Sequence, residues 1–335
     1  MASAAPSTSP CAPAPTTSAR RPVEPAEHSL RTLALGLGDV LREEVLPELG
    51  RREGREHAGD GVGGDVTFAI DERAERRLET YLARHAPDVA FYSEDRGMVR
   101  PPGPVEWVLI VDPIDGTRPA MAGLESACIS IAAARLGDGE PTMADVELGL
   151  VIEIKSGARF LAARGAGVVP LPALSTTTEI DRMLWTYGVR GRPVVETSIV
   201  LEELLNTSSV GGGTFDLGSA AFDMTRIATG QMDAYVDPGP RLVDDVPGMR
   251  AEFERLGRGA VLNNSPYDLA AAALILEESG ATVTDAYGES LSGCPLLGSG
   301  HEFQMSCVAA ANPDLNAKIV ASITQGIERL RAHRA

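Results

Sequence analysis

Two aspartates stand three residues apart at the end of an apolar run. Asp112 and Asp115 follow residues 107–111, Trp-Val-Leu-Ile-Val, within the segment Asp-Pro-Ile-Asp-Gly-Thr. Proline fixes φ and glycine permits a tight backbone path, so both carboxylates are expected to project from one turn beyond a buried strand. Carboxylates this close repel each other unless a cation lies between them, and Mg²⁺ prefers such oxygen ligands. The segment therefore predicts a Mg²⁺ site.

The two residues after Asp115 add groups that could bind phosphate. Gly116 and Thr117 stand where the chain would enter a helix, and the first N–H groups of a helix have no partner within it. Those N–H groups could bind a phosphate, and the Thr117 hydroxyl could orient a water molecule. The alternative is a simple turn with aspartate caps, because Asp, Pro and Gly are common turn residues. The preceding apolar strand favours the metal site.

Three further acids are candidates for the same site. Glu94 follows the apolar run 89–92, so two neighbouring strands would end in carboxylates at one cleft. Asp71 and Asp268 each stand at the expected start of a helix, where Asp71 could orient the Thr117 hydroxyl. The small residues after Asp268 would let its helix pack close to a metal cluster. The ordinary alternatives are a surface position for Glu94 and helix N-caps for the two aspartates.

Hydrophobic periodicity predicts helices and short strands that alternate along the chain. A Pro- and Thr-rich stretch at 170–178 indicates a boundary between two domains. We therefore expect mixed, layered α/β packing with a tail over 1–27, an N-terminal α+β domain over 28–175 and a C-terminal α/β domain over 176–335. The expected helices are 28–49, 71–85, 193–205, 219–229, 267–279 and 313–331, and the expected strands are 89–92, 107–111, 127–134, 147–154, 159–163, 184–187, 232–236, 282–285 and 307–311.

Composition limits the partners and the location. The chain has 335 residues and a formal net charge of −17, which disfavours binding to nucleic acid or to anionic lipid. A phosphate substrate then requires cations that reverse the local field. No apolar run reaches the length of a membrane helix, and the N-terminus lacks the apolar core of a signal peptide. The sequence predicts a cytoplasmic protein that contacts neither nucleic acid nor membrane.

Together these pieces resemble the inositol monophosphatase and fructose-1,6-bisphosphatase superfamily of metal-dependent, lithium-sensitive phosphatases. The resemblance runs from about residue 28 to 330 and follows the family's order of motifs. An aspartate near a helix start comes first, followed by the acid after a strand, Asp-Pro-Ile-Asp-Gly-Thr, Gly-Ser-Ala-Ala, Asp-Ala-Tyr and a late aspartate. The segments 64–71 and 233–241 look most similar to the archaeal dual-activity type.

The resemblance implies a five-layered αβαβα sandwich and a Mg²⁺-dependent phosphomonoesterase of carbohydrate metabolism, acting on a sugar or cyclitol phosphate, commonly as a homodimer. Two or three Mg²⁺ ions are implied, with Asp71 and Thr117 activating water and Gly116 and Thr117 binding phosphate. The implied metal ligands are Glu94, Asp112, the Ile114 carbonyl, Asp115 and Asp268, Glu94 also counting among the catalytic residues. The implied substrate contacts are Gly218, Ser219, Ala220 and Asp237.

Several positions depart from the family pattern, all on the leaving-group side. Arg118 and Pro119 follow the Asp-Gly-Thr segment, Tyr267 stands where a tryptophan is usual, and an insertion spans 244–265 with an amphipathic stretch at 249–256. These departures leave open a 3′-phosphonucleotide phosphatase of the same superfamily. A non-catalytic, metal-binding descendant is the third hypothesis, although none of the implied metal carboxylates is missing.

Overall fold

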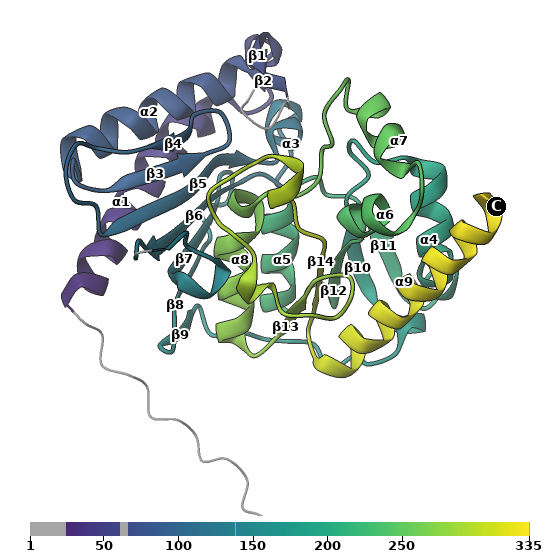
Figure 1. The fold of residues 1–335 in the computed structure, drawn as a ribbon. Helices are drawn as coiled ribbons and strands as arrows, with labels where there is room; N and C mark the ends of the chain where they lie inside the picture. Colours follow the sequence, from purple (N-terminus) through teal and green to yellow (C-terminus); the bar gives the residue numbers. More distant parts are fainter. Residues whose placement is uncertain (1–24, 61–65, 138, 335) are drawn as a thin grey trace, which may run out of the picture.

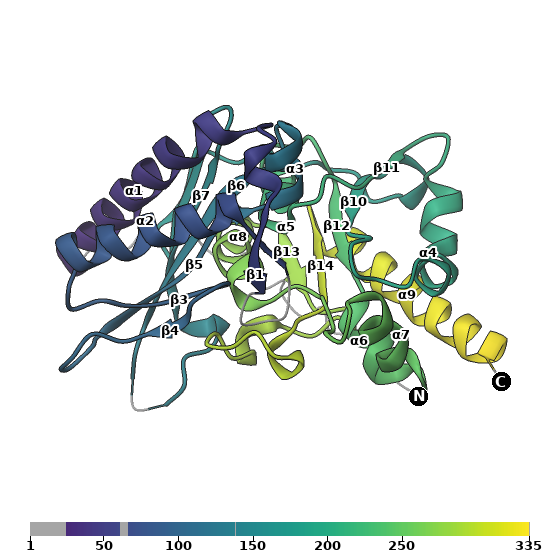
Figure 2. The same cartoon turned by 90° about the horizontal axis from the view of Figure 1, so that it is seen from above.

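The computed structural model describes residues 25–60, 66–137 and 139–334. Two sheets and three helical layers alternate through the molecule (Figures 1 and 2), so the predicted αβαβα sandwich is confirmed. Residues 1–24 of the predicted tail over 1–27 lie outside the described residues. Among the described residues, no helix combines the length and the apolar composition that crossing a membrane requires.

The larger sheet carries the strand that ends in the two aspartates. Its strand order is β4-β3-β5-β6-β7-β8-β9, in which β5 pairs in parallel with β3 and antiparallel with β6. The β5–β6 register shifts between Asp112, which pairs with Ser130, and Asp115, which pairs with Cys128. The strands are β3 (Ala90–Ser93), β4 (Gly97–Val99), β5 (Trp107–Asp115), β6 (Cys128–Arg135), β7 (Val146–Glu153), β8 (Arg159–Ala163) and β9 (Gly167–Val169).

Two amphipathic helices cover the outer face of this sheet. Helix α1 (Pro25–Val45) and helix α2 (Ala69–His85) pack against each other, and both contact the sheet. Their buried leucines recur at helical spacing, as Leu37 and Leu41 do on α1 and Leu78 and Leu82 do on α2. Burial of these stripes holds the start of α2 beside the end of β5.

Helices α5 (Ala220–Ala228) and α8 (Pro266–Ser279) form the middle layer between the two sheets. The alanines at 270–273 are all buried, and α8 runs so close to β7 that a Cβ on Gly149 would lie 2.5 Å from the Ala271 carbonyl oxygen. One apolar cluster thus joins strands of both sheets through these helices. The two predicted domains therefore share a core.

The smaller sheet has the strand order β11-β10-β12-β14-β13. Helices α4 (Val194–Thr207) and α9 (Pro313–Arg334) pack together, and with this sheet and the inserted helices they share a further apolar cluster (Figure 1). The strands are β10 (Leu184–Tyr187), β11 (Gly213–Phe215), β12 (Ala234–Asp237), β13 (Thr282–Thr284) and β14 (Cys307–Ala310).

The predicted insertion at 244–265 contains a helix where its amphipathic pattern indicated one. Helix α7 (Met249–Leu256) follows α6 (Gly239–Asp245) and buries Met249 and Phe253 in the outer apolar cluster. The insertion is therefore anchored to the body of the protein, and the chain leaving it returns to the start of α8.

Some local predictions were wrong in detail. The sequence predicted no strand between residues 49 and 71, but β1 (His57–Asp60) pairs antiparallel with β2 (Val66–Phe68), while residues 61–65 lie outside the described part. Helix α2 begins at Ala69, so Asp71 is its third residue, and α8 begins at Pro266. The short elements not expected from the sequence are α3 (Thr117–Ala122), β4, β9, β11, α6 and six single 3-10 turns.

Candidate active site

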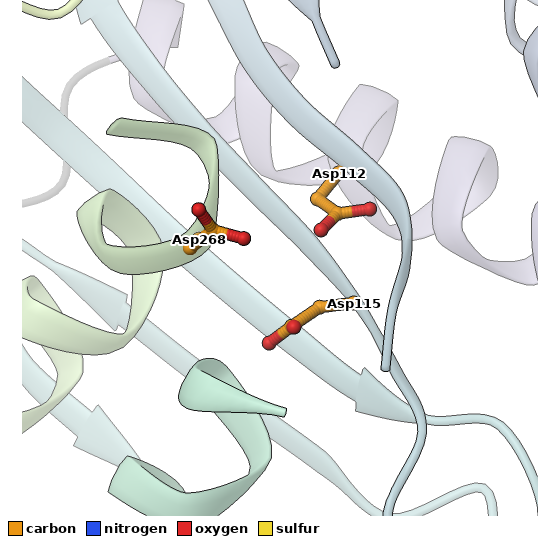
Figure 3. A group of neighbouring side chains, drawn as sticks. All are labelled: Asp112, Asp115 and Asp268. Atoms are coloured by element: carbon orange, nitrogen blue, oxygen red, sulfur yellow. The ribbon is translucent and has the colours of Figure 1, made fainter. Parts of the chain in front are cut away.

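Three carboxylates meet where β5 ends and α8 begins. Asp112 and Asp115 belong to β5 and Asp268 to the first turn of α8, and one oxygen from each lies within 4.8 Å of the other two. Figure 3 shows the three side chains directed toward a common space. The strand end and the helix start, which are far apart in sequence, thus bring together the acids that the sequence predicted as metal ligands.

Hydrogen bonds hold each carboxylate by one oxygen. The Ile114 N–H donates to Asp112 Oδ1 over 2.9 Å, and the Ser265 N–H donates to Asp268 Oδ2 over 2.6 Å. Asp115 Oδ2 accepts from the Ser219 hydroxyl at 2.8 Å and from the Ala221 N–H at 2.7 Å. The second oxygen of each carboxylate is left to face the shared space, which is how hard-oxygen ligands are presented to a divalent cation.

Burial makes this cluster costly without a cation. Burial raises the pKa of Asp112 well above its usual range, and the nearby acidic side chains raise it further. Burial also raises the pKa of Asp115 to about 6 and that of Asp268 to about 8. Buried carboxylates whose charges repel one another are stabilised by a bound cation, so the donor set fits Mg²⁺.

Thr117 and Asp71 form a hydrogen-bonded pair beside the cluster. The Thr117 hydroxyl donates to Asp71 Oδ1 at 3.0 Å and also lies 3.2 Å from the Ile114 carbonyl oxygen. Asp71 Oδ2 accepts from the Phe68 N–H at 2.9 Å, so the carboxylate is fixed by the start of α2. Asp71 therefore orients the hydroxyl from the third position of its helix, not from the N-cap.

Gly116 makes the turn between β5 and the short helix α3. Its φ is +89°, and a Cβ there would lie 2.7 Å from the Ser126 carbonyl oxygen and 2.9 Å from the Ser219 Cβ. Both the backbone conformation and the space require glycine at this position. The turn lets Thr117 follow the strand end without a side chain blocking the shared space.

A cavity of about 360 Å³ opens in front of these groups. That volume is in the range of small-molecule sites. The wall includes Glu94, Ile114, Gly116, Thr117, Gly218, Ser219 and Ala220 from the sequence prediction, together with the three clustered aspartates. Ser219 lies in the wall, and its hydroxyl already orients Asp115, so its contact with a substrate stays a prediction.

Glu94 borders the cavity but lies outside the group of three aspartates. Glu75 of α2 is buried, and its carboxylate holds the turn that carries Glu94. Glu75 accepts from the Ser93 hydroxyl at 2.8 Å and from the Asp95 N–H at 3.3 Å, while Thr67 donates to Asp95 at 2.5 Å. Glu94 is therefore positioned for a ligand at the edge of the cluster, and its metal role stays a prediction.

Asp237 does not lie in the cavity wall, in contrast to the expectation of a direct substrate contact. Its side chain is fully buried in an ion pair with the equally buried Arg192. Asp237 also accepts from the Gly239 N–H and from the Asn264 amide. With its oxygens occupied inside the protein, Asp237 ties β12 to the loop after β10 and to the end of the insertion.

The positions that depart from the family pattern lie around the cavity. Arg118 and Pro119 form part of its wall, and the insertion contributes Asn263 and Asn264. Tyr267 is buried behind the aspartates, where its ring stacks on Tyr92 with centroids 6.4 Å apart. Two of the departures from the family pattern, at 118–119 and in the insertion, thus lie in the wall of this cavity.

Sequence reasoning missed two basic residues of the wall, Arg190 and Arg192. Both follow β10 in the segment Arg-Gly-Arg, and two arginines directly after an apolar strand of a chain with net charge −17 were a usable signal. Two further acids, Asp216 and Asp223, also line the cavity. Burial raises the pKa of Asp223 well above its usual range.

A family model for the inositol monophosphatase family matches residues 23–328, which is most of the chain. The chain belongs to the inositol monophosphatase family. Members of this family are phosphoric monoester hydrolases that act on small phosphate esters, and this chain is an enzyme of that class. The resemblance inferred from the ordered motifs is thereby confirmed.

Two of the named relatives match nearly the whole length of this inositol monophosphatase family member, and a third matches about half of it. The fructose-1,6-bisphosphatase/inositol-1-monophosphatase of Methanothermobacter thermautotrophicus is 28% identical over 87% of this chain and 95% of its own length. The inositol-1-monophosphatase of Caulobacter vibrioides is 27% identical over 92% of this chain and 99% of its own. The Nus factor SuhB of Xylella fastidiosa is 28% identical, but over 55% of this chain and 65% of its own.

Solved structures share the fold at lower identity. The Thermotoga maritima IMPase superimposes with a TM-score of 0.65 at 20% identity, covering 90% of this chain and 99% of its own. The inositol monophosphatase-fructose 1,6 bisphosphatase MJ0109 gene product gives 0.66 at 21% identity, covering 87% and 98%. These similarities show that the family member described here has the same fold.

Proposed function

We propose that this chain is a Mg²⁺-dependent phosphomonoesterase that hydrolyses a sugar or cyclitol phosphate by direct attack of water. The observation that carries the proposal is the meeting of Asp112, Asp115 and Asp268 beside the Thr117–Asp71 pair in one cavity. A bound Mg²⁺ would neutralise the phosphoryl oxygens and lower the pKa of the attacking water. The near-full-length relatives whose names include an inositol-1-monophosphatase activity support the substrate class.

The Thr117–Asp71 pair supplies a path for the proton of the attacking water. The Thr117 hydroxyl donates its proton to Asp71, which leaves the Thr117 oxygen to accept a hydrogen bond from water. As the water oxygen bonds to phosphorus, its proton passes to Thr117 Oγ1 while the hydroxyl proton passes to Asp71 Oδ1. The bond from phosphorus to the leaving oxygen breaks on the opposite side, the leaving alkoxide takes a proton from solvent water, and no covalent phosphoenzyme forms.

The remaining residues hold the substrate in position. The backbone N–H groups at Gly116 and Thr117 bind the phosphate at the start of α3. Gly218 and Ala220 border the space for the sugar or cyclitol, as do the inserted residues Asn263 and Asn264. Positioning and charge neutralisation are the main contributions of the protein to such a reaction.

The test is inorganic phosphate release by the purified protein with and without Mg²⁺. The substrate panel contains inositol 1-phosphate, fructose 1,6-bisphosphate, other hexose and pentose phosphates and 3′-phosphoadenosine 5′-phosphate. Mg²⁺-dependent release from a sugar or cyclitol phosphate supports the proposal, and preference for the nucleotide replaces the proposed substrate class. No release at all, with Mg²⁺ still raising the melting temperature, contradicts the proposal and favours a non-catalytic descendant.

The charge-matched variants Asp112→Asn and Asp181→Asn serve as controls in this assay. Asp181 is exposed, outside the cavity wall, and its replacement leaves the site unchanged. Release by the Asp181→Asn protein that vanishes in the Asp112→Asn protein assigns the activity to the carboxylate cluster and excludes a contaminating phosphatase.

A further inference from the structure

The loop over residues 188–193 connects β10 to α4 and reaches the cavity wall. Gly191 in its centre has a φ of +69°, and a Cβ there would lie 2.8 Å from the Leu262 Cβ. Leu262 belongs to the insertion and directly precedes Asn263 of the cavity wall. Glycine is therefore needed for the loop to pack against the inserted segment, and this contact fixes the path of the loop.

The buried Arg192 anchors the loop from inside. Its Nε donates to Asp237 Oδ1 at 3.1 Å, its Nη2 pairs with Asp237 Oδ2, and its Nη1 donates to the Arg190 carbonyl oxygen at 2.7 Å. Asn264 donates to the same Asp237 carboxylate at 2.8 Å. A buried ion pair with these additional hydrogen bonds holds its geometry well. The backbone of Arg190 is thus fixed relative to β12 and the insertion.

Arg190 carries a positive charge into the region of the clustered aspartates. It lines the main cavity and also a smaller adjoining cavity of about 20 Å³, and both cavities have Glu94 and Asp268 in their walls. An immobile loop therefore presents a guanidinium group beside the predicted metal ligands.

A positive charge at this place acts in opposite ways on a metal ion and on a phosphate group. Like charges repel, so Arg190 raises the free energy of a second cation among the same carboxylates. A phosphate group bound to the metal ions would reverse this effect, because a guanidinium matches two phosphoryl oxygens with two parallel N–H groups. The position of Arg190 is therefore better suited to binding substrate than to neutralising the aspartates.

We propose that Arg190 is a phosphate-binding residue that donates to the phosphoryl oxygens of the substrate, with Asp237 and Arg192 as the residues that position it. The role rests on the proposed function and adds a side-chain cation to the metal site. Arg190 binds the phosphoryl group both in the ester and in the inorganic phosphate product. Its contribution is therefore measurable without turnover.

The experiment is calorimetric titration of the purified protein, first with MgCl₂ alone and then with inorganic phosphate at saturating Mg²⁺. Arg190→Gln removes the charge, and Arg190→Lys keeps the charge without the planar fork. Arg77→Gln is the matched control, because Arg77 is exposed on α2 outside both cavities. The melting temperature of each metal-free variant is measured as well, because Arg190 interacts with its surroundings in the folded protein.

In the Arg190→Gln protein we expect phosphate affinity to fall by about 10- to 100-fold, because charge-assisted hydrogen bonds to the phosphate are lost. Mg²⁺ affinity should stay the same or increase, because a repelling charge is gone. The phosphate affinity of the Arg190→Lys protein should lie between those of the wild type and the Arg190→Gln protein. The phosphate affinity of the Arg77→Gln protein should match that of the wild type. This opposite response of the two ligands is the signature of a phosphate ligand, since a merely structural role would weaken both.

Unchanged phosphate affinity in the Arg190→Gln protein would overturn the proposal, as would a parallel loss of Mg²⁺ and phosphate binding. A wild-type protein that binds Mg²⁺ but no phosphate would overturn it too. Failure of the proposed function has a different appearance, namely no phosphate release from any ester by the wild type. The calorimetric comparison among variants can still succeed in that case, so the two failures are distinguishable.

Discussion

The Thr117 hydroxyl lies 3.0 Å from Asp71 Oδ1, although 46 residues separate the two in the sequence. Packing of α2 on the larger sheet brings the start of that helix to the end of β5, where Thr117 follows the aspartates. Asp71 is held by the Phe68 N–H at the same time, so its carboxylate presents a fixed oxygen to the hydroxyl. The pair is thus preorganised beside the carboxylate cluster before any ligand binds.

Replacing Thr117 by valine should abolish most of the turnover while leaving metal binding intact. Loss of a positioned proton-transfer group lowers kcat by about 10²- to 10⁴-fold, and valine has the shape of threonine without the hydroxyl. Thr117→Ser is the matched control, because it keeps the hydroxyl. The measurement is kcat at saturating Mg²⁺ together with the melting-temperature shift caused by Mg²⁺. Equal kcat for the valine and serine variants would exclude the proton path through Thr117.

Replacing Asp112 by asparagine should remove the stabilisation by Mg²⁺ without unfolding the protein. Asparagine can still accept from the Ile114 N–H, and it removes the carboxylate charge at 112 that burial and the neighbouring acids disfavour. The metal-free variant should therefore melt at the same or a higher temperature than the wild type. A ligand at 100 times its Kd stabilises a folded protein by about 2.7 kcal/mol, and this increment should be present in the wild type and absent in the variant.

Thermal melts with and without Mg²⁺ check this expectation, with Asp181→Asn as the charge-matched control. If the Asp112→Asn protein were stabilised by Mg²⁺ as much as the wild type, the metal would bind elsewhere on the chain.

Mg²⁺ affinity should increase with pH across the range in which the cluster titrates. In the metal-free protein, burial raises the pKa of Asp115 to about 6 and that of Asp268 to about 8, so Mg²⁺ must displace protons below these values. Affinity measured by calorimetry should rise from pH 6 to pH 8 and level off above. An affinity independent of pH in this range would mean that the aspartates are already ionised without metal.

The same pKa shifts determine the direction in which the stability of the metal-free protein changes with pH. Between the ordinary aspartate pKa of 3.8 and the raised values, the folded state binds more protons than the unfolded chain. The free energy of unfolding contributed by these groups therefore decreases as pH rises from about 4 to 8. Denaturant unfolding at several pH values should show this decrease, and saturating Mg²⁺ should reduce it.

Replacing Asp237 by alanine should destabilise the protein because it leaves Arg192 buried without its partner. Breaking a buried ion pair costs about 3–5 kcal/mol, whereas breaking an exposed one costs less than about 1 kcal/mol. The exposed pair of Arg135 and Glu106 supplies the control variant Glu106→Ala. The measurement is the free energy of unfolding of both variants in denaturant. A rise in KM without loss of stability would instead support the direct substrate contact that the sequence predicted for Asp237.

The group of clustered aspartates was predictable because two of its residues carry their signal locally. Asp112 and Asp115 end a buried strand, with a proline between them and a glycine after them. Few other kinds of site combine these residues in so short a segment. Long amphipathic helices and most strands were predictable for the same reason, since burial of one face leaves a period in the sequence. Elements of three residues such as β9 and β11 leave no period, so their existence depends on the strands beside them.

By itself, then, the sequence determined the layered fold, the family and the acids of the site, because each is written in short segments or in their order. Only the tertiary structure decided the positions and partners of Asp237, Arg192 and Arg190. Asp237 resembles a substrate ligand along the chain, but its partners Arg192 and Asn264 come from a distant loop and from the insertion. Whether a charge faces a cavity or a buried partner depends on packing between such segments, and no local pattern encodes that choice.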